Sequence, residues 1–226
     1  MSGVGLTHII GAGPLLLDFD GPVCSVFAGE PAPRVAKELV TLLDFRRMAI
    51  PPEIRGEEDP LAVLRWTAET CPVEVVGAIE DAMCAAELRA VRTAAPTPSS
   101  REVIVGANSR GIPLAVVSNN SEPAIRAYLA AHGLTGHIGP IVGRPHAEPA
   151  RMKPNPWAVV TAVDALRADP RSCTLVGDSL TDIEAARAAG VNIIGYANRP
   201  WKTGAFAGAD AVVTSMGDIA AALSSA

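Results

Sequence analysis

The second half of the chain alternates short apolar segments with segments whose apolar residues recur at helical spacing. The strand-like segments are residues 112–117, 137–143, 173–179, 191–197 and 210–215, and the helical ones are residues 122–132, 156–168, 180–190 and 217–225. Gly133 and Gly190 end two of these helices, and Ser121 offers an N-cap to the first. Regular alternation of strand and helix predicts right-handed βαβ units and a parallel sheet.

One apolar segment ends in two carboxylates. Leu15, Leu16 and Leu17 form a run typical of a buried strand, and Asp18 and Asp20 come at its end. Charge at the end of a core strand is costly unless it is paired or bound to a metal ion. We therefore expect this strand in the middle of the sheet, with a charged site at its carboxyl end.

Residues 33–95 differ from the rest of the chain, because their apolar residues follow helical spacing with no convincing strand between them. Prolines at 51, 52, 60 and 72 break this part into pieces. The pattern predicts a helical cap domain of residues 25–95, inserted into an α/β core of residues 1–24 and 96–226. A helix capped by Ser99 or Ser100 leads back to the core, and the GAG at 11–13 is expected to be a flexible lead-in rather than a dinucleotide loop.

Composition narrows the class of protein. The chain has 226 residues, a net charge of −5 and no basic cluster, so a nucleic-acid partner is not expected. No apolar run is long enough to span a membrane, and the N-terminus lacks the basic start of a secretory signal, so we expect a cytoplasmic protein. The cysteines show no metal-binding spacing and are expected to be reduced: Cys24, Cys71, Cys84 and Cys173. Whether the protein is a monomer or a dimer stays open.

Polar residues stand at the carboxyl ends of three predicted strands, where parallel α/β sheets bind ligands. They are Asp18 and Asp20 after the first strand, Ser118, Asn119 and Asn120 after the second, and Asp178 with Asp182 after a later one. Lys153 lies in a loop before a helix. A cluster of carboxylates repels itself unless a cation occupies it, and oxygen ligands suit Mg²⁺.

Four short segments, in their order along the chain, resemble the motifs of the haloacid dehalogenase-like hydrolase superfamily. They are DFDGPV at 18–23, SNN at 118–120, Lys153-Pro154, and GDSLTD at 177–182. The helical insert after the first motif is similar to the small cap of the phosphoglycolate phosphatase and β-phosphoglucomutase branch. The resemblance implies a Rossmann-like α/β core with that cap. Pro22 departs from the usual first motif, which bears on the turn and cap hinge rather than on the aspartates.

The resemblance also implies catalytic roles. Asp18 would attack phosphorus and form an aspartyl-phosphate, and Asp20 would serve as general acid and then as general base. Ser118 and the amide of Asn119 would hold phosphoryl oxygens. Lys153 would neutralise charge on both the nucleophile and the phosphate.

The cofactor implied by the resemblance is Mg²⁺. It would be held by Asp18, by the backbone carbonyl of Asp20 and by Asp178, with Asp182 binding it directly or through water. The expected function is therefore a Mg²⁺-dependent phosphatase, and the expected partner is a small phosphorylated substrate.

Other functions stay open at the level of sequence. The family's dehalogenases and phosphonatases lack an aspartate at the position of Asp20, so this residue favours phosphate-ester hydrolysis. A sugar phosphomutase would use the same aspartates. A non-catalytic phosphate-binding or regulatory protein could keep the fold, and the helical insert could also dock a partner.

Overall fold

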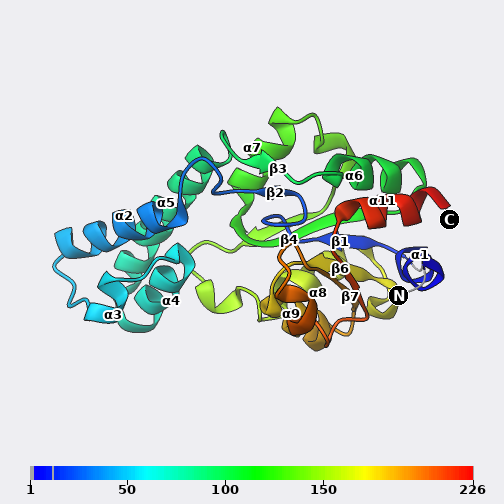
Figure 1. Ribbon diagram of the computed structural model, residues 1–226. Coiled ribbons are helices and arrows are strands. Elements are labelled where there is room, and N and C mark those ends of the chain that lie inside the picture. The colour runs from blue at the N-terminus through cyan, green and yellow to red at the C-terminus, as the bar shows by residue number, and fades with distance from the viewer. Residues whose placement is uncertain (1–2, 12, 226) are drawn as a thin grey trace.

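A six-stranded parallel sheet forms the core of the computed structural model, which describes residues 3–11 and 13–225 (Figure 1). Its strand order is β5-β4-β1-β6-β7-β8. The strands are β1 (Leu15–Leu17), β4 (Leu114–Ser121), β5 (Ile141–Arg144), β6 (Thr174–Gly177), β7 (Asn192–Tyr196) and β8 (Ala211–Val213). The predicted α/β fold is confirmed, and the strand that leads into Asp18 lies inside the sheet between β4 and β6.

The side chains of β1 point alternately into two apolar layers, because successive residues of a strand face opposite sides of the sheet. Leu15 and Leu17 belong to one layer and Leu16 to the other. The first layer is covered by α1 (Gly3–Gly11), α6 (Ser100–Ser109), α7 (Glu122–Ala131) and α11 (Met216–Ser225), and the second by α8 (Trp157–Leu166) and α9 (Leu180–Ala189). With both faces covered, the end of β1 is a buried position for a charged residue.

Four helices build a helical lobe at one end of the molecule (Figure 1). They are α2 (Ala32–Phe45), α3 (Pro52–Arg55), α4 (Pro60–Thr70) and α5 (Val73–Ala90), and they enclose an apolar cluster of their own. Prolines stand in the first turn of α2, α3 and α4, where a missing N–H costs no helical hydrogen bond. These prolines therefore start helices as well as separating them.

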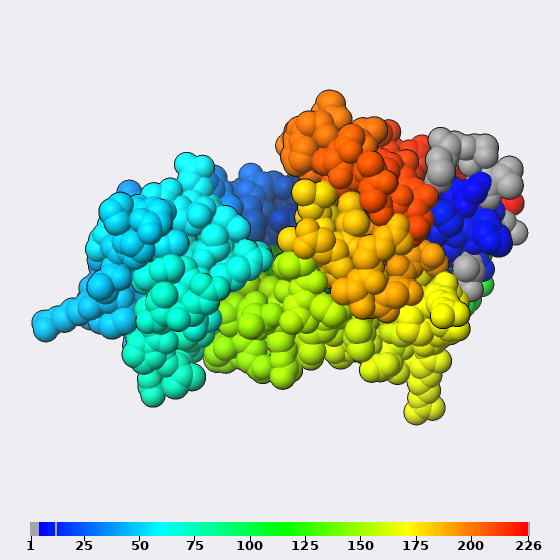
Figure 2. All heavy atoms as spheres, turned by 90° about the horizontal axis from the view of Figure 1, so that it is seen from below, coloured from blue at the N-terminus to red at the C-terminus, as the bar shows by residue number. Residues whose placement is uncertain are grey.

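The chain enters and leaves the helical lobe through two adjacent strands. β2 (Cys24–Ser25) pairs antiparallel with β3 (Ala95–Pro96). The lobe also touches the core directly, since α5 packs on α7 and β4, and α4 packs on the short 3-10 helix η2 (Pro149–Arg151). In Figure 2 the blue and cyan lobe adjoins the yellow-green part of the core. The lobe thus rests on the core at its α4 and α5 sides.

Some local features differ from the expectations or add to them. A helix that the sequence did not indicate, α1, runs up to Gly11 of the GAG segment, and its Ile10 is buried against the core; Ala12 of that segment lies outside the described residues. The strand expected at 137–143 begins only at Ile141, because Gly139 and Pro140 precede it and a 3-10 helix, η1 (Thr135–His137), precedes them. Ser99 and Ser121 stand at the N-cap positions as predicted, although neither side chain makes a capping hydrogen bond.

Short elements complete the described structure. They are the helix α10 (Lys202–Ala205) and the 3-10 helix η3 (Pro170–Ser172). All four cysteines are free, as expected. Across residues 3–11 and 13–225, no helix combines the length and apolar character that crossing a membrane requires.

Candidate active site

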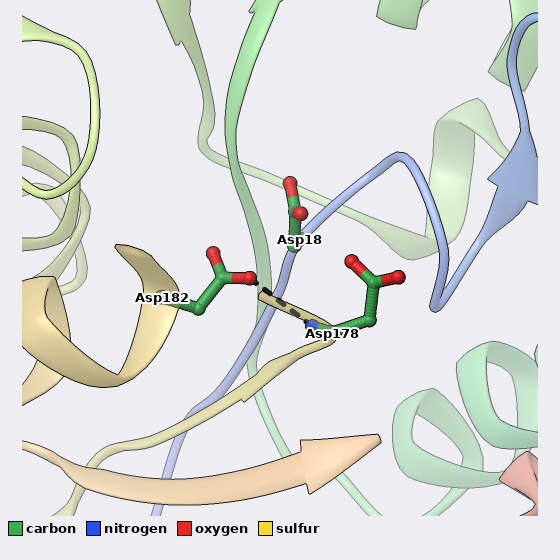
Figure 3. A group of neighbouring side chains, drawn as sticks. All are labelled: Asp18, Asp178 and Asp182. Atoms are coloured by element: carbon green, nitrogen blue, oxygen red, sulfur yellow. Dashed lines mark hydrogen bonds between the residues drawn. The ribbon is translucent and has the colours of Figure 1, made fainter. Parts of the chain in front are cut away.

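Three aspartates from separate segments lie together at the carboxyl ends of the strands (Figure 3). Asp18 follows β1, Asp178 follows β6 and Asp182 lies in the first turn of α9. One carboxylate oxygen of each lies within 4.8 Å of the other two. Asp18 and Asp182 are buried, at 8% and 0% exposure. Oxygen donors at this spacing fit a hard divalent cation such as Mg²⁺.

Lys153 partly balances the charge of this acidic group. Its Nζ lies 2.9 Å from Oδ1 of Asp18, bonds Oδ1 of Asp182, and donates to the carbonyl of Val117 at 3.2 Å. Burial alone would lower the pKa of Lys153, but Asp18 and Asp182 outweigh it and hold that pKa above its ordinary value. Burial raises the pKa of Asp18 to about 8, although Lys153 opposes the shift. A further cation beside Asp18 would favour its ionised form.

Asp182 is fixed by the turn before α9. Its Oδ2 accepts hydrogen bonds from the backbone N–H groups of Asp178 at 3.1 Å and Ser179 at 3.0 Å, and Ser179 completes a capping box with it. A Cβ at Gly177 would lie 2.4 Å from Cγ of Asp182, so this close approach requires glycine. Lys153 Nζ donates a hydrogen bond to the other oxygen, Oδ1. Both oxygens of Asp182 are therefore already engaged.

Asp178 has one engaged oxygen and one open one. Its Oδ2 accepts hydrogen bonds from Asn198 at 2.9 Å and from Lys202 at 2.7 Å, whereas no described residue donates a hydrogen bond to its Oδ1. The turn after Asp20 packs directly against it, since Gly21 has a φ of +108° and a Cβ there would lie 2.4 Å from Cγ of Asp178. Lys202 was not among the predicted site residues.

Asp20 lies close to Asp18 and lines the same cavity. Its Oδ1 accepts a hydrogen bond of 2.9 Å from the backbone N–H of Val26, which ties the carboxyl to the start of the lobe connection. Burial raises the pKa of Asp20 to about 6, against the opposing effect of the Val26 bond. A carboxyl group with such a pKa can both donate and accept a proton near neutral pH.

Ser118 and Asn119 line the cavity from the end of β4. The side chain of Asn119 bonds the backbone of Lys153 twice, accepting from its N–H at 2.8 Å and donating to its carbonyl at 3.3 Å. Ser118 Oγ donates to Oδ1 of Asn120 at 3.2 Å. Asn119 thus helps to position the lysine, a contact that the sequence did not indicate.

A buried ion-pair network joins the helical lobe to this segment, and the sequence analysis missed it. Arg144, at the end of β5, lies between Glu80 and Glu87 of α5, at N–O distances of 2.8 and 2.9 Å. All three side chains are 0–2% exposed. Arg144 also donates to the carbonyl of Asn119, and Glu87 accepts from Ser121 N–H at 2.9 Å. We call Arg144, Glu80 and Glu87 the Arg144 triad.

A family model and known relatives match this chain. The model for haloacid dehalogenase-like hydrolases matches residues 15–190, which include all four motif segments. The chain belongs to this family. The resemblance carried by the motifs is thereby confirmed, and the family membership accounts for the parallel sheet with aspartates at its carboxyl edge.

Relatives of this haloacid dehalogenase-like hydrolase include named phosphatases. A bifunctional riboflavin kinase/FMN phosphatase of Arabidopsis thaliana is 31% identical over 123 residues, which are 54% of this chain and 32% of that protein. A phosphoglycolate phosphatase of Rhodospirillum rubrum is 34% identical over 107 residues, 46% of this chain and 44% of that protein. The chain therefore spans less than half the length of either relative.

The likeness in fold extends over nearly the whole chain. The crystal structure of CbbY from Rhodobacter sphaeroides, in complex with phosphate, has a TM-score of 0.69 and 22% sequence identity. The alignment covers 93% of this chain and 98% of CbbY. The chain thus shares the fold of this solved structure over nearly its whole length.

Proposed function

We propose that this protein is a Mg²⁺-dependent phosphatase that hydrolyses a small phosphorylated metabolite through an aspartyl-phosphate on Asp18. The observation that carries the proposal is the setting of Asp18, a buried carboxylate that lines a cavity, beside Lys153 and close to Asp20. The relatives named as phosphatases support the same class of reaction.

Asp18 acts as the nucleophile. Its Oδ1 accepts hydrogen bonds from Phe19 N–H and Lys153, which leaves Oδ2 as the attacking oxygen. A bond forms from this oxygen to phosphorus while the ester P–O bond breaks, and Asp20 donates its proton to the leaving oxygen. Asp20 then takes a proton from water as the water oxygen attacks phosphorus, which releases phosphate and restores the Asp18 carboxylate.

Lys153 and Ser118 stabilise the charge that develops on the phosphoryl oxygens. Both line the cavity beside Asp18, and their groups are held in place before substrate arrives, Lys153 by Asp182 and Ser118 by its bond to Asn120. Charged and polar groups fixed in advance stabilise a transition state without reorganising. We therefore assign phosphate binding to Ser118, the amide of Asn119, and Lys153.

Asp18 and the open Oδ1 of Asp178 would hold the Mg²⁺ ion, together with the backbone carbonyl of Asp20. Asp182 contributes chiefly by fixing Lys153 and the Asp178 turn, because both of its oxygens are engaged. When bound, the ion offsets the repulsion between the carboxylate nucleophile and the phosphate. Residues 25–95 would serve as the cap that keeps bulk water from the aspartyl-phosphate.

The test is phosphate release from a panel of small phosphomonoesters, with Mg²⁺ or with EDTA. We compare the wild type with Asp18→Asn and with Asp164→Asn, which alters an exposed aspartate on α8 that does not line the cavity. We expect release that requires metal, persists in Asp164→Asn and is lost in Asp18→Asn. Undiminished release by Asp18→Asn would contradict the proposal. Movement of the phosphoryl group within a sugar phosphate, without release, would assign a phosphomutase instead.

A further inference from the structure

The proposed active site opens into a cavity of about 370 Å³ that lies between the sheet and the helical lobe. The core side carries the residues described above. The lobe side is formed by Phe27, Ala32, Asp59, Pro60, Leu61 and Arg65. This volume is near the lower end of the range for ligand pockets, about 300–1,000 Å³, so the cavity suits a small metabolite.

Arg65 lines this cavity and is a cation with no partner among the residues that the structure describes. Lys153, the other positively charged lining residue, is bound to Asp18 and Asp182. Arg65 is half-buried, and within residues 3–11 and 13–225 its guanidinium makes no ion pair and no hydrogen bond. A partly desolvated guanidinium is stabilised when it gains an anionic partner.

Other arginines of the helical lobe do not share this combination of burial and missing partner. Arg55 is paired with Asp44, and Arg89 with Glu30. Arg46 forms no ion pair with a described residue, but it is exposed, so water solvates its charge. Arg65 is therefore set apart by its place at the cavity rather than by its charge.

The fold fixes where Arg65 points. Leu61 and Arg65 are four residues apart on α4, so they share one helix face, and both line the cavity. Val63 and Leu64 are buried in the apolar cluster of the lobe, which holds the rest of the helix in place. α4 also packs against η2 of the core. The Arg65 side chain is thus presented to the cavity by a helix that is packed on two sides.

We propose that Arg65 binds a second anionic group of the substrate, at the end remote from the phosphoryl group that reacts at Asp18. This inference rests on the proposed function, because it takes the reacting phosphate to lie on the core side. A guanidinium binds a carboxylate or a phosphate through two parallel N–H bonds, so either group fits. The substrate class is then a small phosphomonoester that also carries a carboxylate or a second phosphate.

The first experiment measures selectivity. We compare kcat/KM for phosphoglycolate, for 1,3-propanediol bisphosphate and for ethyl phosphate, which lacks a second anion. Arg65→Met should lower the preference for the better doubly anionic ester over ethyl phosphate by about 10- to 100-fold, as expected for a charge-assisted hydrogen bond. The ester that is affected identifies the second anion as carboxylate or phosphate. Arg46→Met, which removes an exposed lobe arginine, should leave the preference unchanged.

Two results would overturn the inference: an equal loss on all three esters, which indicates a structural role, or an unchanged preference. A second measurement separates this inference from the proposed function. If no ester is hydrolysed, calorimetry compares the binding of phosphoglycolate and the bisphosphate to wild type and to Arg65→Met. Binding that weakens at least 10-fold in the variant would support the anion site although catalysis had failed, and equal or absent binding would reject it.

Discussion

Replacing Arg144 by methionine tests the energetic role of the Arg144 triad. The substitution keeps much of the apolar stem but removes the charge from a site where the arginine side chain is 0% exposed. Glu80 and Glu87 then both lose their counter-charge, at 2% and 0% side-chain exposure. Removing one partner of a buried ion pair costs about 3–5 kcal/mol, because the remaining charge stays buried and uncompensated.

The assay is equilibrium unfolding in urea, followed by far-UV circular dichroism. Arg126→Met is the matched control, since Arg126 pairs with Glu122 on the surface of α7 with 56% and 45% of the two side chains exposed. An exposed pair of this kind contributes about 0.3–0.5 kcal/mol. We expect Arg144→Met to lower the free energy of unfolding by about 3–5 kcal/mol, which corresponds to a fall in melting temperature of roughly 6–20 °C.

A compensated variant shows whether buried charge is the cause. Adding Glu80→Gln and Glu87→Gln to Arg144→Met removes the uncompensated carboxylates, so we expect it to recover a substantial part of the lost stability. The reasoning would be refuted if Arg144→Met cost no more than Arg126→Met. It would also fail if the triple variant were as unstable as Arg144→Met, since packing rather than charge would then explain the loss.

Three further outcomes are expected. Mg²⁺ should raise the melting temperature of the wild type, and Asp178→Asn should reduce that shift in a thermal denaturation series with and without EDTA, because the ion offsets repulsion among the buried carboxylates; an equal shift in the variant would contradict this metal site. Gly21→Ala should abolish most phosphate release, because its Cβ would collide with Asp178; wild-type rates would contradict that contact. Gly77 lies inside α5, where alanine is a better helix former than glycine, and a Cβ added there would have no neighbour within 4 Å. Gly77→Ala should therefore raise the free energy of unfolding in urea by about 0.5–1 kcal/mol; a loss of stability would show that α5 is more tightly packed.

The sequence predicted the core well because the signals for its elements are local. Strands and helices of βαβ units differ in apolar periodicity over a few residues, and Gly133 and Gly190 both take the left-handed conformation that ends a helix. Asp18 and Asp178 could be located because each directly follows an apolar strand. Their chemical roles, and the boundary of the cap, stay predictions.

The missed features depend on partners that are distant in sequence. Arg144 ends a strand as many surface arginines do, and only the fold places it beside α5. A signal did exist in α5: Glu80 and Glu87 are seven residues apart and belong to the same buried stripe as Ile79 and Met83. A carboxylate buried at an apolar position of a helix needs a cationic partner or a metal ion to remain charged. The helix α1 was missed because its stability comes from packing against α11 rather than from its own glycine-rich sequence.

Because β2 pairs with β3, the helical lobe is inserted into the core at a single place. Because Ser25 lies opposite Ala95, the chain leaves the core and returns to it at one point, and the sheet is unchanged by whatever lies between. A different insert could replace this one without moving Asp18. The exchange would change the side chains that line the lobe side of the cavity. The new insert would have to supply carboxylates to Arg144 again, a backbone N–H to Asp20, and helices that pack on α7, β4 and η2.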